Sequence, residues 1–225
     1  MTLQQMLQWG AGWLKEREVP EADLNAWYLL ADCFQMERSG YFLHQEEEAD
    51  AGKEKKFRQM IEKRGQRIPL EYILGYTEFM GLKFEVDSHV LIPRQDTETL
   101  VELVLNEQKD KNVSILDMCT GSGCIAVSLK KLGGYACVEG ADISEEALKV
   151  AKRNSEEILE NRDVNSSRTG VIFRRSDMFS AFPETERFNV IVSNPPYIPS
   201  TVIEELEPEE RTYCSMLSNL VLGVP

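Results

Sequence analysis

The sequence predicts an α/β protein in which an N-terminal helical bundle and a β-hairpin connector precede a Rossmann-like domain. Three observations support this fold class. Apolar residues recur at helical spacing near the N-terminus, apolar and charged residues alternate over 82–86, and strand patterns alternate with helical ones from residue 113 onward. We expect the three parts to span 1–65, 66–95 and 96–225.

The first part contains two amphipathic patterns and a charged helix. Their apolar positions are Leu3, Met6, Leu7, Trp13 and Leu14, and then, after Pro20, Leu24, Trp27, Tyr28 and Ala31. Ser39 and Gly40 interrupt the second pattern, and the charged helix is expected from about 46 to 63. Such stripes are typical of a bundle core rather than of a cofactor site, so only the bundle's surface is available to a partner.

The connector is expected to form a hairpin, followed by a helix. The apolar positions of its second strand are Leu82, Phe84 and Val86, and Met80 and Gly81 suit the turn. Asp96 or Thr97 is expected to cap the following helix. The core face of this helix is predicted to contain Leu100, Leu103 and Val104.

The third part alternates strands and helices. We expect strands at 113–118, 135–141, 171–175 and 188–193, a helix from Gly123 to Lys131, a helix capped by Ser144, and a polar loop at 161–170. This alternation implies right-handed crossovers and a parallel sheet, in which the last strand lies beside the first. Ligands bind outside the carboxyl ends of such strands.

Composition limits the classes of partner and compartment. The net charge of −13 argues against nucleic acid as the direct substrate and favours a protein partner. Five cysteines without a CxxC pair and two histidines argue against a metal site and indicate reduced thiols. No apolar run approaches the roughly 20 residues needed to cross a bilayer, and the N-terminus does not resemble a signal peptide. We therefore expect a cytoplasmic protein without membrane contact.

The stretch ILDMCTGSGCIAVSL, residues 115–129, is typical of a strand, a small-residue loop and a helix that together bind a nucleotide. Gly121 and Gly123 permit a tight turn and close approach of a ligand. Asp142, at the end of the next strand, is placed to accept hydrogen bonds from ribose hydroxyls. Two alternatives remain open: a tight turn that binds no ligand, and a purely structural Asp142 that caps the helix entry ahead of Ser144. A dehydrogenase is a weaker interpretation, because it rests on the G-x-G-x-x-A pattern alone.

The stretch Asn194-Pro195-Pro196-Tyr197 follows the last strand and faces that loop. The Asn194 side-chain carbonyl and the Pro195 backbone carbonyl offer two acceptors for a planar –NH2 group, on which Tyr197 can stack. Such positioning favours methyl transfer to an amide or amino nitrogen. The alternative is a proline-rich turn that only ends the strand.

These motifs together resemble the HemK-type family of release-factor glutamine N5-methyltransferases. The resemblance rests on DMCTGSG, Asp142, SDMF at 176–179, NPPY, and RIPLEYILGYTEFMGLKFEVDSHVLIPRQDTE, and it covers about residues 1–208. It implies a class I S-adenosylmethionine-dependent methyltransferase domain after a helical substrate-docking domain. The expected substrate is the glutamine of the GGQ motif in peptide chain release factors.

The resemblance also implies roles for individual residues. The expected contacts of S-adenosyl-L-methionine are Cys119, Thr120, Gly121, Ser122, Gly123, Asp142, Asp177, Met178 and Asn194. The expected substrate-binding residues are Asn194, Pro195, Pro196 and Tyr197, of which Asn194, Pro195 and Tyr197 are the catalytic candidates. The family usually has glycine where this chain has Cys119, and often an aromatic residue where it has Met178.

Two observations keep other functions open. NPPY is shared with DNA or RNA adenine N6-methyltransferases. The resemblance stops after Glu209, and residues 212–225 carry no charged side chain, which suggests a truncated or frame-shifted tail and an incomplete domain. A remnant that binds cofactor or release factor without catalysis is therefore a third interpretation.

Overall fold

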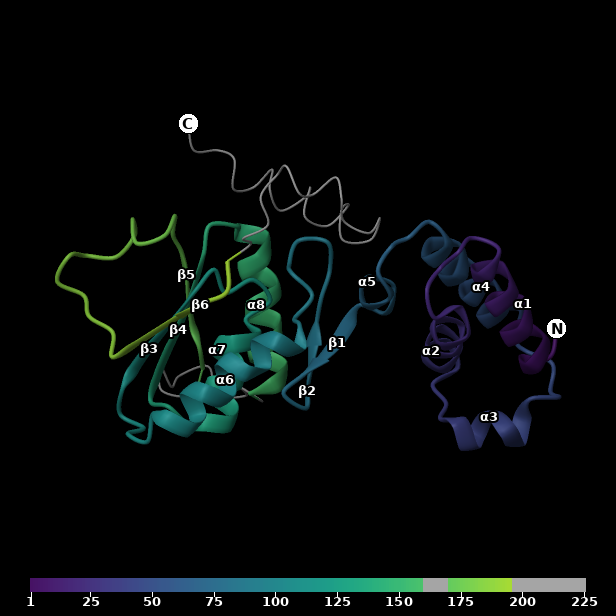
Figure 1. The fold of residues 1–225 in the computed structure, drawn as a ribbon, viewed down its shortest axis with the longest axis horizontal. Coiled ribbons are helices and arrows are strands. Elements are labelled where there is room, and N and C mark those ends of the chain that lie inside the picture. The colour runs from purple at the N-terminus through teal and green to yellow at the C-terminus, as the bar shows by residue number, and fades with distance from the viewer. Residues whose placement is uncertain (160–169, 196–225) are drawn as a thin grey trace. The chain divides into compact units, whose positions relative to one another are not determined.

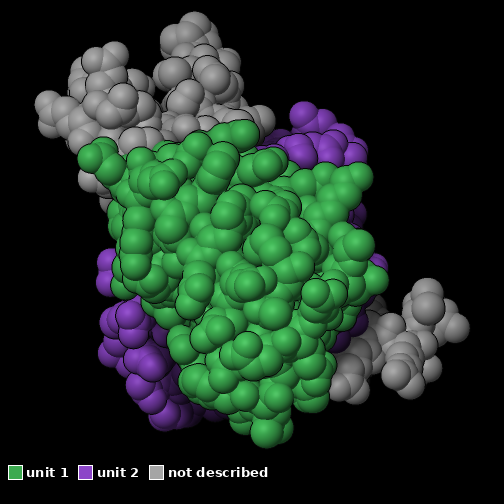
Figure 2. Space-filling model, turned by 90° about the vertical axis from the view of Figure 1, so that its right-hand side faces the viewer, with its two compact units in different colours: residues 1–74 green, residues 75–225 purple. Residues whose placement is uncertain are grey.

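The computed structural model describes residues 1–159 and 170–195, which form two compact units (Figure 1). Figure 2 colours the units, 1–74 and 75–225, separately. The expected loop at 161–170, except its last residue, and the tail beyond 195 lie outside the described residues. Among the described helices, none is long and apolar enough to cross a membrane.

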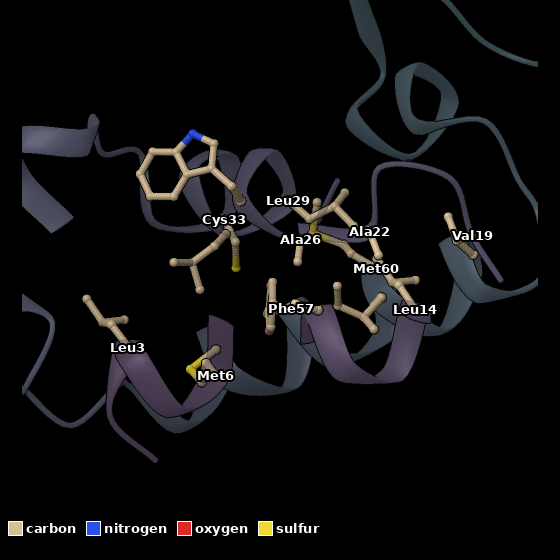
Figure 3. Close-up of a cluster of buried hydrophobic side chains, with 14 of the residues drawn as sticks. Leu3, Met6, Leu14, Val19, Ala22, Ala26, Leu29, Cys33, Phe57 and Met60 are labelled. Carbon is tan, nitrogen blue, oxygen red and sulfur yellow. The ribbon is translucent and has the colours of Figure 1, made fainter. Parts of the chain in front are cut away.

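Unit 1 is a helical bundle. Its helices are α1 (Leu3–Lys15), α2 (Ala22–Phe34), α3 (Arg38–His44), α4 (Ala51–Gly65) and α5 (Leu70–Leu74). Side chains from α1, α2 and α4 meet in one core, where Leu14, Leu29 and Phe57 are fully buried (Figure 3). The predicted bundle is therefore confirmed.

Three details of the bundle differ from the prediction. Ser39 and Gly40 do not break the chain but lie inside the short helix α3. The charged helix begins at Ala51, because the Asp50 side chain accepts hydrogen bonds from the first backbone N–H groups. On α2 the apolar face is shifted, so that Tyr28 is exposed and Leu29 is buried.

Close packing of α1 against α4 depends on one glycine. A Cβ at Gly10 would lie 2.9 Å from Phe57 Cζ and 3.0 Å from Ile61 Cδ1, whereas one at Gly12 would meet nothing within 4 Å. We expect Gly10→Ala to lower the free energy of unfolding of unit 1 by about 1–3 kcal/mol through overpacking. The matched change Gly12→Ala should raise it by roughly 0.5–1 kcal/mol.

All three tryptophans of the chain lie in unit 1, so urea unfolding followed by tryptophan fluorescence measures this difference. If the two glycine variants shift the midpoint in the same direction, the packing argument is wrong.

Unit 2 opens with an antiparallel hairpin of β1 (Tyr76–Phe79) and β2 (Leu82–Glu85). Met80 and Gly81 turn between them with φ of 53° and 71°, values that suit the twist of a two-residue hairpin turn. The predicted turn is therefore confirmed.

The rest of the described part of unit 2 is a parallel sheet with helices. The strands are β3 (Ser114–Met118), β4 (Cys137–Asp142), β5 (Ile172–Arg175) and β6 (Val190–Ser193), in the order β5-β4-β3-β6. The helices are α6 (Gln95–Glu107), α7 (Cys124–Gly133) and α8 (Glu145–Ile158), drawn beside the sheet in Figure 1. The predicted parallel sheet and the pairing of β6 with β3 are confirmed. Strand order reverses between β4 and β6 around β3, which makes a topological switch point at the carboxyl ends of the strands.

Alternate residues of the strands enter two cores. Ile115, Val138 and Val192 pack in the larger one with residues of α6 and α7. Leu116 and Met118 belong to a smaller cluster that includes Phe182 and Phe188. This period of two is what a sheet with apolar side chains on both faces requires.

The start and the phase of α6 differ from the prediction. Arg94 is the N-cap residue, with no side-chain cap, so neither Asp96 nor Thr97 caps the helix. Val101 is fully buried, whereas Leu103 is 51% exposed. Thr97 is instead buried on the inward face of the first turn.

Candidate active site

The loop between β3 and α7 contains three residues with left-handed backbone conformation. Their φ angles are 62° at Cys119, 54° at Gly121 and 79° at Gly123. A Cβ at Gly121 would meet nothing within 4 Å, whereas one at Gly123 would lie 3.1 Å from the Cβ of Ala151. Gly121 therefore leaves open space at the loop, while Gly123 allows α7 to pack closely against α8.

A buried carboxyl group lies beneath this loop. Asp117 Oδ2 accepts hydrogen bonds from Thr120 Oγ1 at 2.6 Å and from the backbone N of Ala126 at 3.2 Å. Its Oδ1 is buried without a partner in the described part of the chain. Burial raises the pKa of Asp117 from 3.8 to about 7, although the two hydrogen bonds act in the opposite direction. Asp117 therefore joins the loop to the first turn of α7.

Asp142 connects the same loop to the start of α8. Its Oδ2 accepts from the backbone N of Gly121 at 2.9 Å, and its Oδ1 accepts from the backbone N of Ser144 at 2.9 Å. Ser144 in turn caps α8 through Ala147. Each carboxylate oxygen keeps a further lone pair for a ligand hydroxyl. The structural role and the predicted ligand role of Asp142 are therefore compatible.

The end of β6 lies against the end of β3. Ser193 Oγ donates to the carbonyl oxygen of Met118 at 2.8 Å and contacts the Cys119 thiol. Burial, and then the nearby charge of Asp142, raise the pKa of this thiol. The following residue, Asn194, donates from Nδ2 to Thr97 Oγ1 at 2.9 Å. The asparagine and the glycine loop therefore lie at neighbouring strand ends, as the topology predicts.

The turn after β5 lies at the same edge of the sheet. The backbone N of Ser176 donates to the carbonyl oxygen of Asp142, and Ser176 Oγ donates to the carbonyl oxygen of Met178. Met178 has φ of 47° and is 53% exposed. Ser176 therefore joins the turn that contains Asp177 and Met178 to the carboxyl end of β4.

Comparison with known proteins identifies the family. A family model described as the PrmC N-terminal domain matches residues 5–75, and one described as the methyltransferase small domain matches residues 94–205. The release factor glutamine methyltransferase of Geobacter sulfurreducens is 37% identical over 212 residues, which are 94% of this chain and 71% of that protein. The chain belongs to the release factor glutamine methyltransferase family. Proteins of the same name from Leptospira interrogans and Clostridium botulinum are 39% and 36% identical, over 83% and 95% of this chain and 64% and 74% of theirs.

For a member of the release factor glutamine methyltransferase family, the described part of the site joins four segments at one sheet edge. The residues predicted to bind the cofactor lie in the loop after β3, at the end of β4, after β5 and after β6. Pro195 is exposed after β6, whereas Pro196 and Tyr197 lie outside the described residues. The predicted roles of all these residues remain predictions.

Two of the residues that the structure places at the site of this family member are not among those predicted from the sequence. Asp117 carries a signal, because it is the only charged residue in the apolar run of β3. Nothing in the sequence marks Thr97 as a site residue, because its contact with Asn194 depends on how the chain folds. No cluster of metal-ligating side chains occurs among residues 1–159 and 170–195.

Proposed function

We propose that this chain transfers a methyl group from S-adenosyl-L-methionine to the side-chain amide nitrogen of the glutamine in the GGQ motif of peptide chain release factors. Family membership supports the proposal, and one observation carries it. Asn194 Nδ2 is held by Thr97, and within the described residues Asn194 Oδ1 accepts no hydrogen bond. A held carboxamide with a free carbonyl is an acceptor suited to a planar –NH2 group.

The residues present fit the proposed cofactor. Gly121 leaves open space at the loop, and the loop begins α7, whose N-terminal end favours polar and anionic groups. Asp142 keeps lone pairs for the two ribose hydroxyls, and Asp177 and Met178 would flank the adenine. When bound, the cofactor supplies a methyl group on a positively charged sulfur.

The contribution of the chain to the reaction is positioning. Asn194 Oδ1 and the Pro195 carbonyl oxygen would accept the two N–H bonds of the glutamine amide, which directs its nitrogen toward the glycine loop. In the transfer the glutamine nitrogen would gain the methyl group and give up one proton, which would pass to solvent because neither carbonyl acceptor is a base. Held acceptors oriented before the reaction can supply several kcal/mol of the barrier reduction without a strong base.

The proposed partner is a protein in the cytoplasm. The net charge of −13 disfavours a nucleic acid substrate, and the four described cysteines carry free thiols. The surface of unit 1 would help to dock the release factor.

Labelled transfer tests this function. The chain is incubated with methyl-labelled S-adenosylmethionine and a bacterial release factor, and the label is located by mass spectrometry of the peptides. We expect label on the GGQ glutamine, and none when that glutamine is replaced by alanine. A parallel reaction with DNA in place of the release factor tests the alternative, methyl transfer to adenine. Label on adenine, or calorimetric binding of the cofactor without transfer to the release factor, would contradict the proposal.

A further inference from the structure

A buried threonine on α6 holds the asparagine at the end of β6. Thr97 Oγ1 accepts a hydrogen bond from Asn194 Nδ2 at 2.9 Å, and Thr97 is 7% exposed. Leaving a buried polar group without a hydrogen-bond partner costs free energy, so the folded state retains the hydrogen bond between Thr97 and Asn194. The two residues are 97 positions apart in the sequence, and only the fold brings them together.

In the structure, the NH2 end of the Asn194 side chain makes the contact with the Thr97 hydroxyl. A carboxamide has a carbonyl oxygen that accepts and an NH2 group that donates, and half a turn about its bond exchanges them. An –NH2 substrate requires the carbonyl. Because the Asn194 NH2 group is bonded to Thr97, the carbonyl oxygen is turned the other way.

The first turn of α6 is itself anchored. Glu98 Oε1 accepts from the backbone N of Met80 in the hairpin turn at 2.6 Å. The Thr97 backbone N donates to the carbonyl oxygen of Arg94, and Val101, one turn later, is fully buried in the core. The residues before and after Thr97 are therefore both held in place. A residue can orient another side chain only when its own position is fixed in this way.

We propose that Thr97 is a positioning residue, which holds the Asn194 carboxamide with its carbonyl oxygen toward the substrate amide. The inference rests on the proposed transfer to a glutamine nitrogen. Thr97 acts through Asn194, so its loss should reduce the rate of the bound complex more than the affinity for the cofactor.

Three variants test the role. Thr97→Val removes the acceptor at nearly constant shape, Thr97→Ser retains it, and Thr77→Val on β1 is a matched control away from Asn194. We expect Thr97→Val to lower kcat about ten-fold, as the loss of one orienting hydrogen bond implies. Thr97→Ser and Thr77→Val should remain within about two-fold of the parent, and the cofactor Kd should be unchanged throughout.

A second measurement does not depend on activity. Nitrogen-15 spectra of the full chain show the side-chain NH2 pairs, and the Asn194 pair is assigned by its loss in Asn194→Ala. We expect Thr97→Val to shift and broaden this pair, and Thr97→Ser to restore it.

The outcomes separate this inference from the proposed function. Unchanged kcat in an active Thr97→Val chain, or an unchanged Asn194 signal, would overturn the positioning role. If the signal moves in Thr97→Val but the parent chain labels no release factor, Thr97 still orients Asn194 and only the proposed function is wrong.

Discussion

Asn194→Ala is expected to reduce methyl transfer to the release factor by about a hundred-fold or more while S-adenosylmethionine still binds. The change removes the side-chain acceptor at the end of β6, and a misdirected nitrogen loses the advantage of positioning. The loop contacts of Asp117 and Asp142 do not involve Asn194, so most of the cofactor affinity should remain. Single-turnover transfer and calorimetry of cofactor binding measure the two effects.

Asn189→Ala is the matched control for this change. Asn189 precedes β6 at its other end, and its Oδ1 accepts hydrogen bonds from the backbone N and Oγ of Ser114. Its loss should lower stability by about 1 kcal/mol without a comparable loss of rate. If Asn194→Ala keeps more than half of the activity, or if Asn189→Ala is equally inactive, Asn194 is not the amide acceptor.

The sequence predicts the sheet well, because its signals are local. Short apolar runs separated by helical patterns identify β3, β4, β5 and β6, and their alternation implies the parallel order. Errors occur where one local signal competes with packing. Ser39 and Gly40 look like a break but lie within α3, and Leu103 matches helical spacing although Val101 faces the core.

In the site, too, local sequence signals predict some features and miss those that depend on packing. The loop after β3 and the acidic end of β4 are recognisable from spacing, and both lie at one edge of the sheet. The two meanings of Asp142, a ligand acceptor and a structural cap, could not be separated by sequence, because one carboxylate can do both. Thr97 resembles a helix cap, yet its hydroxyl is used by Asn194, a contact that no local pattern encodes.

Asp117 should make the stability of unit 2 depend on pH. Burial raises its folded pKa from 3.8 to about 7. Because the folded form binds its proton more tightly than the unfolded chain, this contribution is complete below about pH 4 and is lost as the pH rises through about 7. The loss is on the order of 4 kcal/mol in total, of which roughly 3 develops between about pH 5 and pH 8. Asp117→Asn should remove this dependence, since an amide oxygen can still accept from Thr120 and Ala126 and carries no charge.

Urea unfolding followed by circular dichroism at the two pH values measures the effect as a difference between Asp117→Asn and the parent chain. The contributions of all other titrating groups cancel in this difference. Glu102→Gln removes one negative charge from an exposed position on α6 and controls for the change in net charge. We expect Asp117→Asn to gain stability relative to the parent at the higher pH and Glu102→Gln to gain none. A difference that stays constant between the two pH values would show that Asp117 is not protonated in the folded loop. The glycine loop would then rest on a buried negative charge, whose Oδ1 has no hydrogen-bond partner among the described residues.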